Sequence, residues 1–344
     1  MAVSRVTLSD VPNLSLGCAV LGSGGGGQVS GAAELLSQTL ELGAVEVVAL
    51  DALRPGARTA LVGAVGSPTV MLERLPGNQE FVTAVRAWER HAGVRLDAVC
   101  PLEIGGVNGI LGVNVAAHLG LPVVDADGMG RAFPRLDMTV LAGQVPAAPA
   151  ALAESRGATV VLDGLSDTDV EGAVRRLLPS LGTWSAICLY GGEVSASRGL
   201  VRGSISRALE LGRILKKTRS TNAAGLLGLH TAPQFAGTVI ELLRARSGQG
   251  VATMEGHVDP GQTLRIDFRE EYVLATLDGE QVACVPDIIT LLDVRTRLPV
   301  LAEELRTGQR LELLVLAGPV TGDGGPAPAG LADYGLHPGI GSVA

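Results

Sequence analysis

The segment "DAVCPLEIGGVNGILGVNVAAHLGLPVVDADGMG" (residues 97–130) contains one complete copy of the pattern that decides the fold. Residues 97–106 form an apolar, strand-like run. Residues 107–120 have the length of a helix and end at a glycine, and residues 121–130 form a second apolar run. Two strands joined by a helix of this length are typical of a βαβ unit, in which the strands lie parallel. The segment therefore predicts part of a mostly parallel sheet.

The same alternation continues on both sides of this segment. The strand patterns lie at 45–50, 58–66, 158–164 and 185–194, and the helix patterns at 28–43, 78–93, 167–182 and 204–218. Residues 16–22 fit either a strand or the end of a buried helix, since so short an apolar run cannot decide.

The pattern changes after about residue 235. Residues 263–294 alternate in polarity around a hairpin turn at 277–280, and residues 309–318 form a further strand pattern. We therefore expect an α/β protein with two domains. The first, residues 1–167, is a mostly parallel α/β domain with a Gly-rich loop, and the second, residues 168–344, is β-rich after about residue 235.

Composition excludes several classes of protein. The chain has 344 residues, 47% of them hydrophobic and 18% charged, which suffices for a large core. The net charge of −8 and the lack of a long basic run argue against nucleic-acid binding. We expect no signal peptide, because the N-terminal residues contain no apolar core region. We expect no membrane span, because no run of 18 apolar residues occurs. The four cysteines are too far apart for a zinc finger and fit a reduced cytoplasm. A chain this apolar and Gly-rich also suggests a homo-oligomer.

A run of four glycines, Gly24, Gly25, Gly26 and Gly27, precedes the helix pattern at 28–43. No Gly-Lys-Ser/Thr follows, so it is not a Walker loop, and it fits G-x-G-x-x-G almost by accident. We expect no nucleotide here. One interpretation is that the backbone amides approach an anion or a small substrate. The other is a tight turn where a helix packs on the sheet.

Carboxylates follow the predicted strands at the edge where parallel sheets bind ligands. Asp125 and Asp127 are two positions apart, so on a strand they would share a face at about 7 Å. Such a pair could ligate a divalent metal or share a proton, but it could equally cap a Gly-rich turn. Glu103 stands in an apolar run, where a carboxylate is costly to bury without a partner.

Three further polar residues follow the same strands. Arg131 could neutralise the aspartates or hold an anionic group of a substrate. Asn108 opens the helix that follows Glu103. Ser67 could contact a ligand or cap a helix.

Several of these motifs occur together, in the same order, in one known family. They are "GSGGGGQ" (22–28), "PLEIGGVNG" (101–109), "VVDADGMGRAFPRL" (123–136), "LRIDFREEYVLA" (264–275) and "VPDIITLLD" (285–293). The chain thereby resembles the S-methyl thiohydantoin desulfurase domain family, from about residue 10 to about residue 340. The resemblance implies two domains and an activity that removes the sulfur substituent of a thiohydantoin ring to leave a hydantoin. It also implies an association with hydantoinase/oxoprolinase-type enzymes.

Hydrolysis of that C–S bond needs a base for water and an acid for the leaving group or ring nitrogen. The carboxylates assigned to this chemistry are Glu103, Asp125 and Asp127. A divalent metal on Asp125 and Asp127 could instead activate the water. The amides of residues 24–27 would bind the ring carbonyl or a side-chain carboxylate of the substrate, and Arg131 could hold a substrate carboxylate.

The chain departs from the family pattern directly after the glycines. Gln28 and Val29 stand where the family resemblance leads us to expect an acidic residue and a proline. This departure supports an alternative function, that of a non-catalytic partner or regulatory subunit of a hydantoinase/oxoprolinase-type enzyme.

Overall fold

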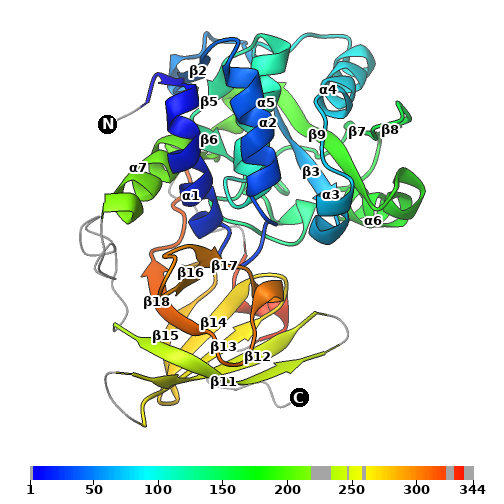
Figure 1. The fold of residues 1–344 in the computed structure, drawn as a ribbon. Coiled ribbons are helices and arrows are strands. Elements are labelled where there is room, and N and C mark those ends of the chain that lie inside the picture. Colours follow the sequence, from blue (N-terminus) through cyan, green and yellow to red (C-terminus); the bar gives the residue numbers. More distant parts are fainter. Residues whose placement is uncertain (1–2, 218–233, 246–247, 258–260, 323–328, 337–344) are drawn as a thin grey trace.

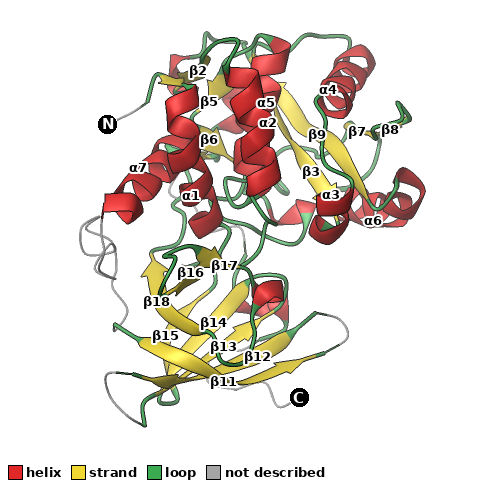
Figure 2. Cartoon of the chain, viewed as in Figure 1, coloured by secondary structure: helices red, strands yellow, loops and turns green. Residues whose placement is uncertain are grey.

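The computed structural model describes residues 3–217, 234–245, 248–257, 261–322 and 329–336. They form an α/β body and an antiparallel β body that pack against each other (Figures 1 and 2). The predicted fold class, a mostly parallel α/β domain followed by a β-rich domain, is confirmed. The aromatic-poor core consists mainly of Val, Leu, Ala and Ile side chains.

The α/β body is built on an eight-stranded sheet with a parallel centre. In spatial order its strands are β1 (Arg5–Val6), β2 (Val45–Val48), β5 (Val123–Val124), β4 (Ala98–Pro101), β3 (Arg58–Gly66), β9 (Trp184–Glu193), β7 (Ala150–Ala153) and β8 (Thr159–Leu162). The four strands from β2 to β3 are parallel, and the strands outside them are antiparallel to their neighbours.

Helices cover the sheet because successive strand residues point to opposite faces. Along β3, Ala60, Val62 and Ala64 face one apolar core, while Leu61 and Val65 face another. The helices are α1 (Val11–Leu21), α2 (Ser30–Leu40), α3 (Pro68–Glu73), α4 (Gln79–Ala92), α5 (Val107–Leu119), α6 (Asp167–Leu177) and α7 (Ser204–Lys217). The first core contains residues of α1, α2, α4, α5 and α7, and the second contains residues of α6.

The first apolar segment is the end of a helix. Residues 16–22 complete α1, so the glycine run links α1 to α2 and does not follow a strand. This arrangement differs from the strand–loop–helix unit of dinucleotide-binding folds.

The sheet of the α/β body extends past residue 167. Strand β9 pairs with β3 at its centre, and α7 packs on α1. The two-stranded ladder of β6 (Ala126–Asp127) and β10 (Val201–Arg202) also links the two sides of that residue.

The β body is one antiparallel sheet in the described part of the chain. In spatial order it contains β15 (Glu280–Cys284), β14 (Tyr272–Leu277), β13 (Thr263–Phe268), β12 (Gly250–Gly256), β11 (Ala236–Arg244), β18 (Arg310–Leu316), β16 (Ile288–Asp293) and β17 (Pro299–Val300). The expected hairpin turn joins β14 to β15, where Asp278 and Gly279 both have positive φ, as a tight two-residue turn requires. Part of the Gly/Pro-rich segment 318–330 lies outside the described residues.

The two bodies meet at the glycine run. The Ser23 hydroxyl donates to the carbonyl of Ile289 in β16, and the Ile289 N–H donates back to it. The Tyr272 N–H donates to the Ser23 carbonyl, and the Ala302 N–H to the Gly24 carbonyl. These buried bonds fix the start of β14 against the α/β body, which places residues of both bodies around one cavity.

Candidate active site

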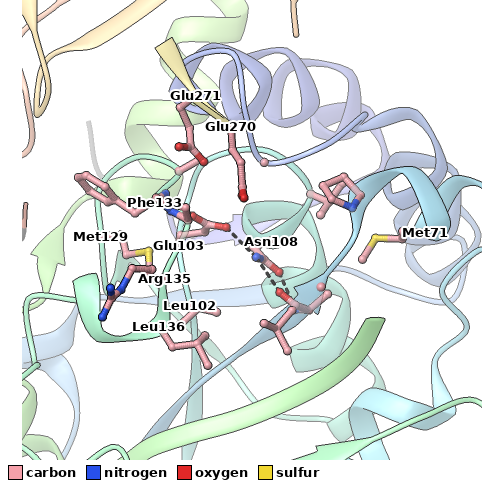
Figure 3. A pocket seen from close by; sticks show the side chains of 18 of the residues that line it. Met71, Leu102, Glu103, Asn108, Met129, Phe133, Arg135, Leu136, Glu270 and Glu271 are labelled. Carbon is pink, nitrogen blue, oxygen red and sulfur yellow. Dashed lines mark hydrogen bonds between the residues drawn. The ribbon is translucent and has the colours of Figure 1, made fainter. Parts of the chain in front are cut away.

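A cavity of about 80 Å³ lies beyond the carboxyl ends of β3 and β4 (Figure 3). The α/β body contributes Glu103 and Asn108 to its lining, and the β body contributes Glu270 and Glu271. The cavity continues into a groove of about 650 Å³, with which it shares Gly26, Gly66, Pro68, Arg175, Glu270 and Glu271. The cavity lies beyond the carboxyl ends of parallel strands, where the sequence analysis expects a ligand to bind.

Two neighbours hold Glu103 in place. Its Oε1 accepts a hydrogen bond from the side-chain amide of Asn108 at 2.8 Å, and its Oε2 accepts one from the N–H of Phe133 at 3.0 Å. Burial dominates these bonds and raises the pKa of Glu103 to about 8. A carboxyl group with this pKa can both give and take a proton near neutral pH.

Asn108 fixes this arrangement to the sheet. Its Oδ1 accepts from the N–H of Ala64 at 2.7 Å, and its Nδ2 donates to the carbonyl of Ala64 at 3.1 Å as well as to Glu103. The amide therefore connects β3 with the start of α5 and orients the glutamate. The structure brings both of these predicted residues into one site.

Glu271, like its neighbour Glu270, is a cavity carboxylate that the sequence analysis did not single out. It is 2% exposed, and its Oε2 has no hydrogen-bond partner among the described residues. Burial first, and then the neighbouring Glu270, raise its pKa well above that of an ordinary glutamate. The only sequence signal was its place within the quoted "LRIDFREEYVLA" segment, because the cavity forms only when the β body docks. Figure 3 shows Glu271 beside Glu270, with the Glu270 side chain pointing toward Glu103 and Asn108.

Arg131 connects the two bodies. The guanidinium is fully buried and donates to the carbonyls of Asp287 and Tyr272 in the β body and of Ala132 in its own loop. It lies outside the set of side chains that line the cavity. The structure thus gives Arg131 a role in holding the β body, and does not place it where the prediction of a substrate contact requires.

Asp125 and Asp127 are not brought to the cavity either. Asp125 accepts from the amides of Ile205 and Ser206 and from the Ser206 hydroxyl. Asp127 is fully buried. The donors to Asp127 are the amides of Ile104, Met129 and Gly130 and the hydroxyl of Ser204.

The protein itself supplies partners for both aspartates. Asp125 accepts three hydrogen bonds from protein donors, and Asp127 accepts four. No group of three or more His, Cys, Asp or Glu side chains suited to a metal occurs among the residues that the structure describes. The arrangement corresponds to the alternative noted for this pair, in which aspartates cap a turn.

The glycine run lines the groove, but other residues of the protein pack closely against three of its glycines. A Cβ at Gly24 would lie 2.5 Å from the ring of Tyr272, and one at Gly25 would lie 2.5 Å from Cγ of Glu271. A Cβ at Gly26 would lie 2.9 Å from Cα of Gly106. Gly24 and Gly25 are therefore needed where the two bodies approach each other, and Gly26 is needed where it packs on Gly106 within the α/β body. Gly24, Gly25, Gly26 and Gly27 also line the groove, together with the predicted Ser67.

Ser67 and Gln28 have clear local roles. The Ser67 hydroxyl accepts from the N–H of Val70 at 3.3 Å and caps α3. The Gln28 side chain donates to Glu304 and lies outside the glutamate cavity. The departure at Gln28 thus removes no carboxylate from that cavity.

The cysteines play no part in this site. Cys18, Cys100 and Cys188 are buried, and burial raises the pKa of each thiol.

Among the described helices, none is long and apolar enough to cross a membrane.

The comparisons with known proteins agree with this architecture. A crystal structure of a protein from Chromobacterium violaceum superposes with a TM-score of 0.73 at 26% identity, covering 91% of this chain and 92% of that one. No curated protein matches. The family model described as "S-Me-THD-like, N-terminal domain" matches residues 9–164, and "S-Me-THD-like, C-terminal domain" matches residues 165–331. The chain therefore belongs to the S-Me-THD-like family, the S-methyl thiohydantoin desulfurase family that its motifs resemble.

Proposed function

We propose that this chain is a hydrolase that removes the sulfur substituent of an S-methyl thiohydantoin, or a closely similar ring, to give the hydantoin. The observation that carries the proposal is that two glutamates, one from each body, line one cavity. Glu103 is fixed by hydrogen bonds to its oxygens, and Glu271 has a buried oxygen without a protein partner. Membership of the family supports the class of substrate.

The chemistry needs one base and one acid. Water adds to the ring carbon that bears sulfur while Glu103, as the carboxylate, takes a proton from the water. Glu271, as the neutral acid, donates a proton to the ring nitrogen of the C=N bond. The C–S bond then breaks, and the hydroxyl proton of the intermediate passes to Glu271 as the carbonyl forms. The proton on Glu103 passes to the departing methanethiolate, so both glutamates return to their starting states. The products are the hydantoin and methanethiol, and ring and water atoms are all accounted for.

The burial of both groups suits these roles. Desolvation favours the neutral form of Glu271, which is the form that donates. The pKa of Glu103, about 8, leaves part of the population ionised at neutral pH and gives a stronger base than an ordinary glutamate. A cavity of about 80 Å³ has room for several water-sized groups, and it opens into the wider groove.

The test is thiol release from a panel of S-methyl thiohydantoins and thiohydantoins, with the hydantoin product identified by mass spectrometry. We expect turnover by the wild type, and a loss of about 100-fold or more in kcat for Glu103→Gln and for Glu271→Gln. Glu46→Gln, at an exposed position on β2, is the matched control and should keep full activity. Turnover that persists in both cavity variants would overturn the assignment.

A chelator arm separates the remaining hypotheses. Thiol release that disappears with chelator would return a divalent metal to the mechanism. If no ring releases thiol, the alternative of a partner subunit is favoured, and co-purification with a hydantoinase/oxoprolinase-type enzyme is then the measurement.

A homo-oligomer and a cytoplasmic location also stay predictions, which light scattering and cell fractionation can test.

A further inference from the structure

We propose that Tyr334 is a positioning residue for Glu271, and that the Tyr334 hydroxyl donates a hydrogen bond to the carboxylate that remains when Glu271 gives up its proton. The inference rests on the proposed function, in which Glu271 is the acid, and names the residue that stabilises it after proton transfer. Tyr334 belongs to the short helical turn η7 (Leu331–Tyr334), which packs on β14. Glu271 directly precedes that strand.

The turn that carries Tyr334 is anchored on both sides. Leu331 and Leu336 are buried in the second apolar core, and the Leu336 N–H donates to the Leu331 carbonyl at 3.0 Å. The Tyr334 residue as a whole is only half-buried, yet its hydroxyl oxygen is fully buried. A tyrosine near the surface ordinarily keeps its polar end in water. Here the hydroxyl points into the protein instead.

The two polar ends complement each other. The Tyr334 hydroxyl and Oε2 of Glu271 are both buried, and neither has a hydrogen-bond partner among the described residues. A phenol O–H can donate, and a carboxylate oxygen can only accept. Leaving either group alone in the interior costs free energy, which a bond between them recovers, directly or through one water.

Electrostatic effects on the pKa values place these groups in one cluster. Burial first, and then the charge of Glu271, raise the pKa of Tyr334, and Arg131, Glu270 and Glu103 act on it as well. Burial lowers the pKa of Arg131, and Tyr334 has the largest opposing effect. The phenol therefore lies near both the proposed acid and the arginine of the junction.

The groups that face Glu271 act in opposite directions on its ionised form. Burial, the largest cause, raises its pKa, and so do Glu270 and Glu103, whereas Arg131 lowers it. The Arg131 guanidinium is held by three backbone carbonyls, so the junction sets its position. The Tyr334 O–H is the donor of this cluster that has no other partner in the described part of the chain.

The bond forms where the reaction needs it. Glu271 starts neutral, becomes a carboxylate when the ring nitrogen takes its proton, and is neutral again when the hydroxyl proton of the intermediate reaches it. The buried carboxylate is the costly form of the residue. A donor that meets the carboxylate, and not the neutral acid, lowers the barrier without tightening substrate binding. We therefore expect Tyr334 to affect kcat and not KM.

The first measurement follows Glu271 itself and needs no turnover. Carbon NMR of protein with isotope-labelled glutamate carboxyl groups records the titration of each group, and Glu271→Gln identifies the signal of Glu271. We expect Tyr334→Phe to make Glu271 about a tenfold weaker acid, because the carboxylate loses its donor. Glu103 should titrate as in the wild type, because its oxygens accept from Asn108 and the Phe133 N–H.

Two further variants separate the hydrogen bond from packing. A fluorinated tyrosine at position 334 is a stronger donor of nearly the same size, so it should make Glu271 a stronger acid. Tyr190→Phe is the matched control, because it removes another buried hydroxyl, which donates to the Leu136 carbonyl at 3.4 Å. In thiol release, Tyr334→Phe should lower kcat about tenfold with KM nearly unchanged, and Tyr190→Phe should change neither.

The outcomes separate this inference from the proposed reaction. A Glu271 that titrates unchanged, or as a stronger acid, in Tyr334→Phe would overturn the inference, whatever thiol release shows. A shift in the same direction with phenylalanine and with the fluorinated tyrosine would overturn it too. The expected titrations without thiol release from any ring would keep the hydrogen bond and reject the reaction. If Tyr334→Phe does not fold, the fluorinated protein decides the question.

Discussion

Glu103 is held by donors that fit its ionised form, yet burial keeps a proton on it up to a pKa of about 8. Both of its oxygens accept hydrogen bonds, from Asn108 and from the Phe133 N–H. The desolvation of a fully buried carboxylate outweighs these two bonds. This balance gives the residue its proposed role as a base.

The pKa of Glu103 predicts how stability depends on pH. The folded-state pKa, about 8, lies above the ordinary 4.5, so the residue contributes stability in full below pH 4.5 and loses it as pH rises toward 8. Glu103→Gln cannot lose that proton, so its melting temperature relative to that of the wild type should rise between pH 4.5 and 8. Calorimetry of both proteins across this range measures it, with Glu46→Gln as the control. Parallel curves would contradict the shift.

In the wild type, kcat/KM should rise over the same range and level off above pH 8.

Residues differ in how well the sequence reveals their role. Glu103 could be found because a carboxylate in an apolar strand end must have a partner, and Asn108 follows it five positions later. Glu271 could not, because nothing in "FREEY" shows which glutamate turns inward. That depends on contacts with residues 20–24, about 250 positions away.

Helix α7 shows how an element can depend on a distant carboxylate. Oδ1 of Asp125 accepts from the N–H groups of Ile205 at 2.9 Å and Ser206 at 3.1 Å, and these amides belong to the first turn of the helix. Amides at a helix start lack partners within the helix, and a carboxylate there also favours the helix dipole. Asp125 thus caps α7 from 80 positions away in the sequence.

We predict that Asp125→Ala destabilises the protein by about 2 kcal/mol or more, because two amides and the Ser206 hydroxyl lose their acceptor. Asp125→Asn is the matched control, since its amide oxygen can still accept from the helix. Urea unfolding measures stability, and thiol release measures activity. We expect the Asn variant to keep most of both. A stable but inactive Asn variant would instead assign the carboxylate to catalysis.

The sequence predicts elements better than their contacts. Alternating apolar patterns gave the strands and helices of the α/β body, and the Asp-Gly turn gave the β14–β15 hairpin. The two aspartates of "DADGMG" suggested a site because their spacing on a strand is favourable. The sequence could not show that α7 and the loop residues Ile104 and Gly130 would supply donors for the oxygens of these aspartates.

At the scale of the whole molecule, the site exists only while the two bodies stay docked. One wall comes from α5 and the residues that follow β4, and the other from the residues that directly precede β14. Arg131 and Ser23 hold these walls together through buried bonds to Tyr272, Asp287 and Ile289. Loss of this contact would separate Glu103 from Glu271 without changing either residue, so activity depends on the junction as much as on the acids.

The glycine run is the closest approach in this junction, which leads to our last prediction. Gly24 has φ +82°, and a Cβ there would lie 2.5 Å from two ring atoms of Tyr272. The ring cannot easily move, because the Tyr272 hydroxyl donates to the Val300 carbonyl and its N–H donates to Ser23. Gly24→Ala should therefore cost about 1–2 kcal/mol in backbone strain and about 1–3 kcal/mol more in overpacking.

Gly143→Ala isolates the second of these costs. Gly143 has φ +72° but no atom within 4 Å of the added Cβ, so it should show only the backbone strain. Denaturant unfolding of both variants gives the difference, and thiol release at a temperature where both remain folded shows whether the junction has shifted Glu271. If the two substitutions cost the same, the glycines are not required by the contact with the β body. The run would then have to be explained by a ligand in the groove, as the sequence alone suggested.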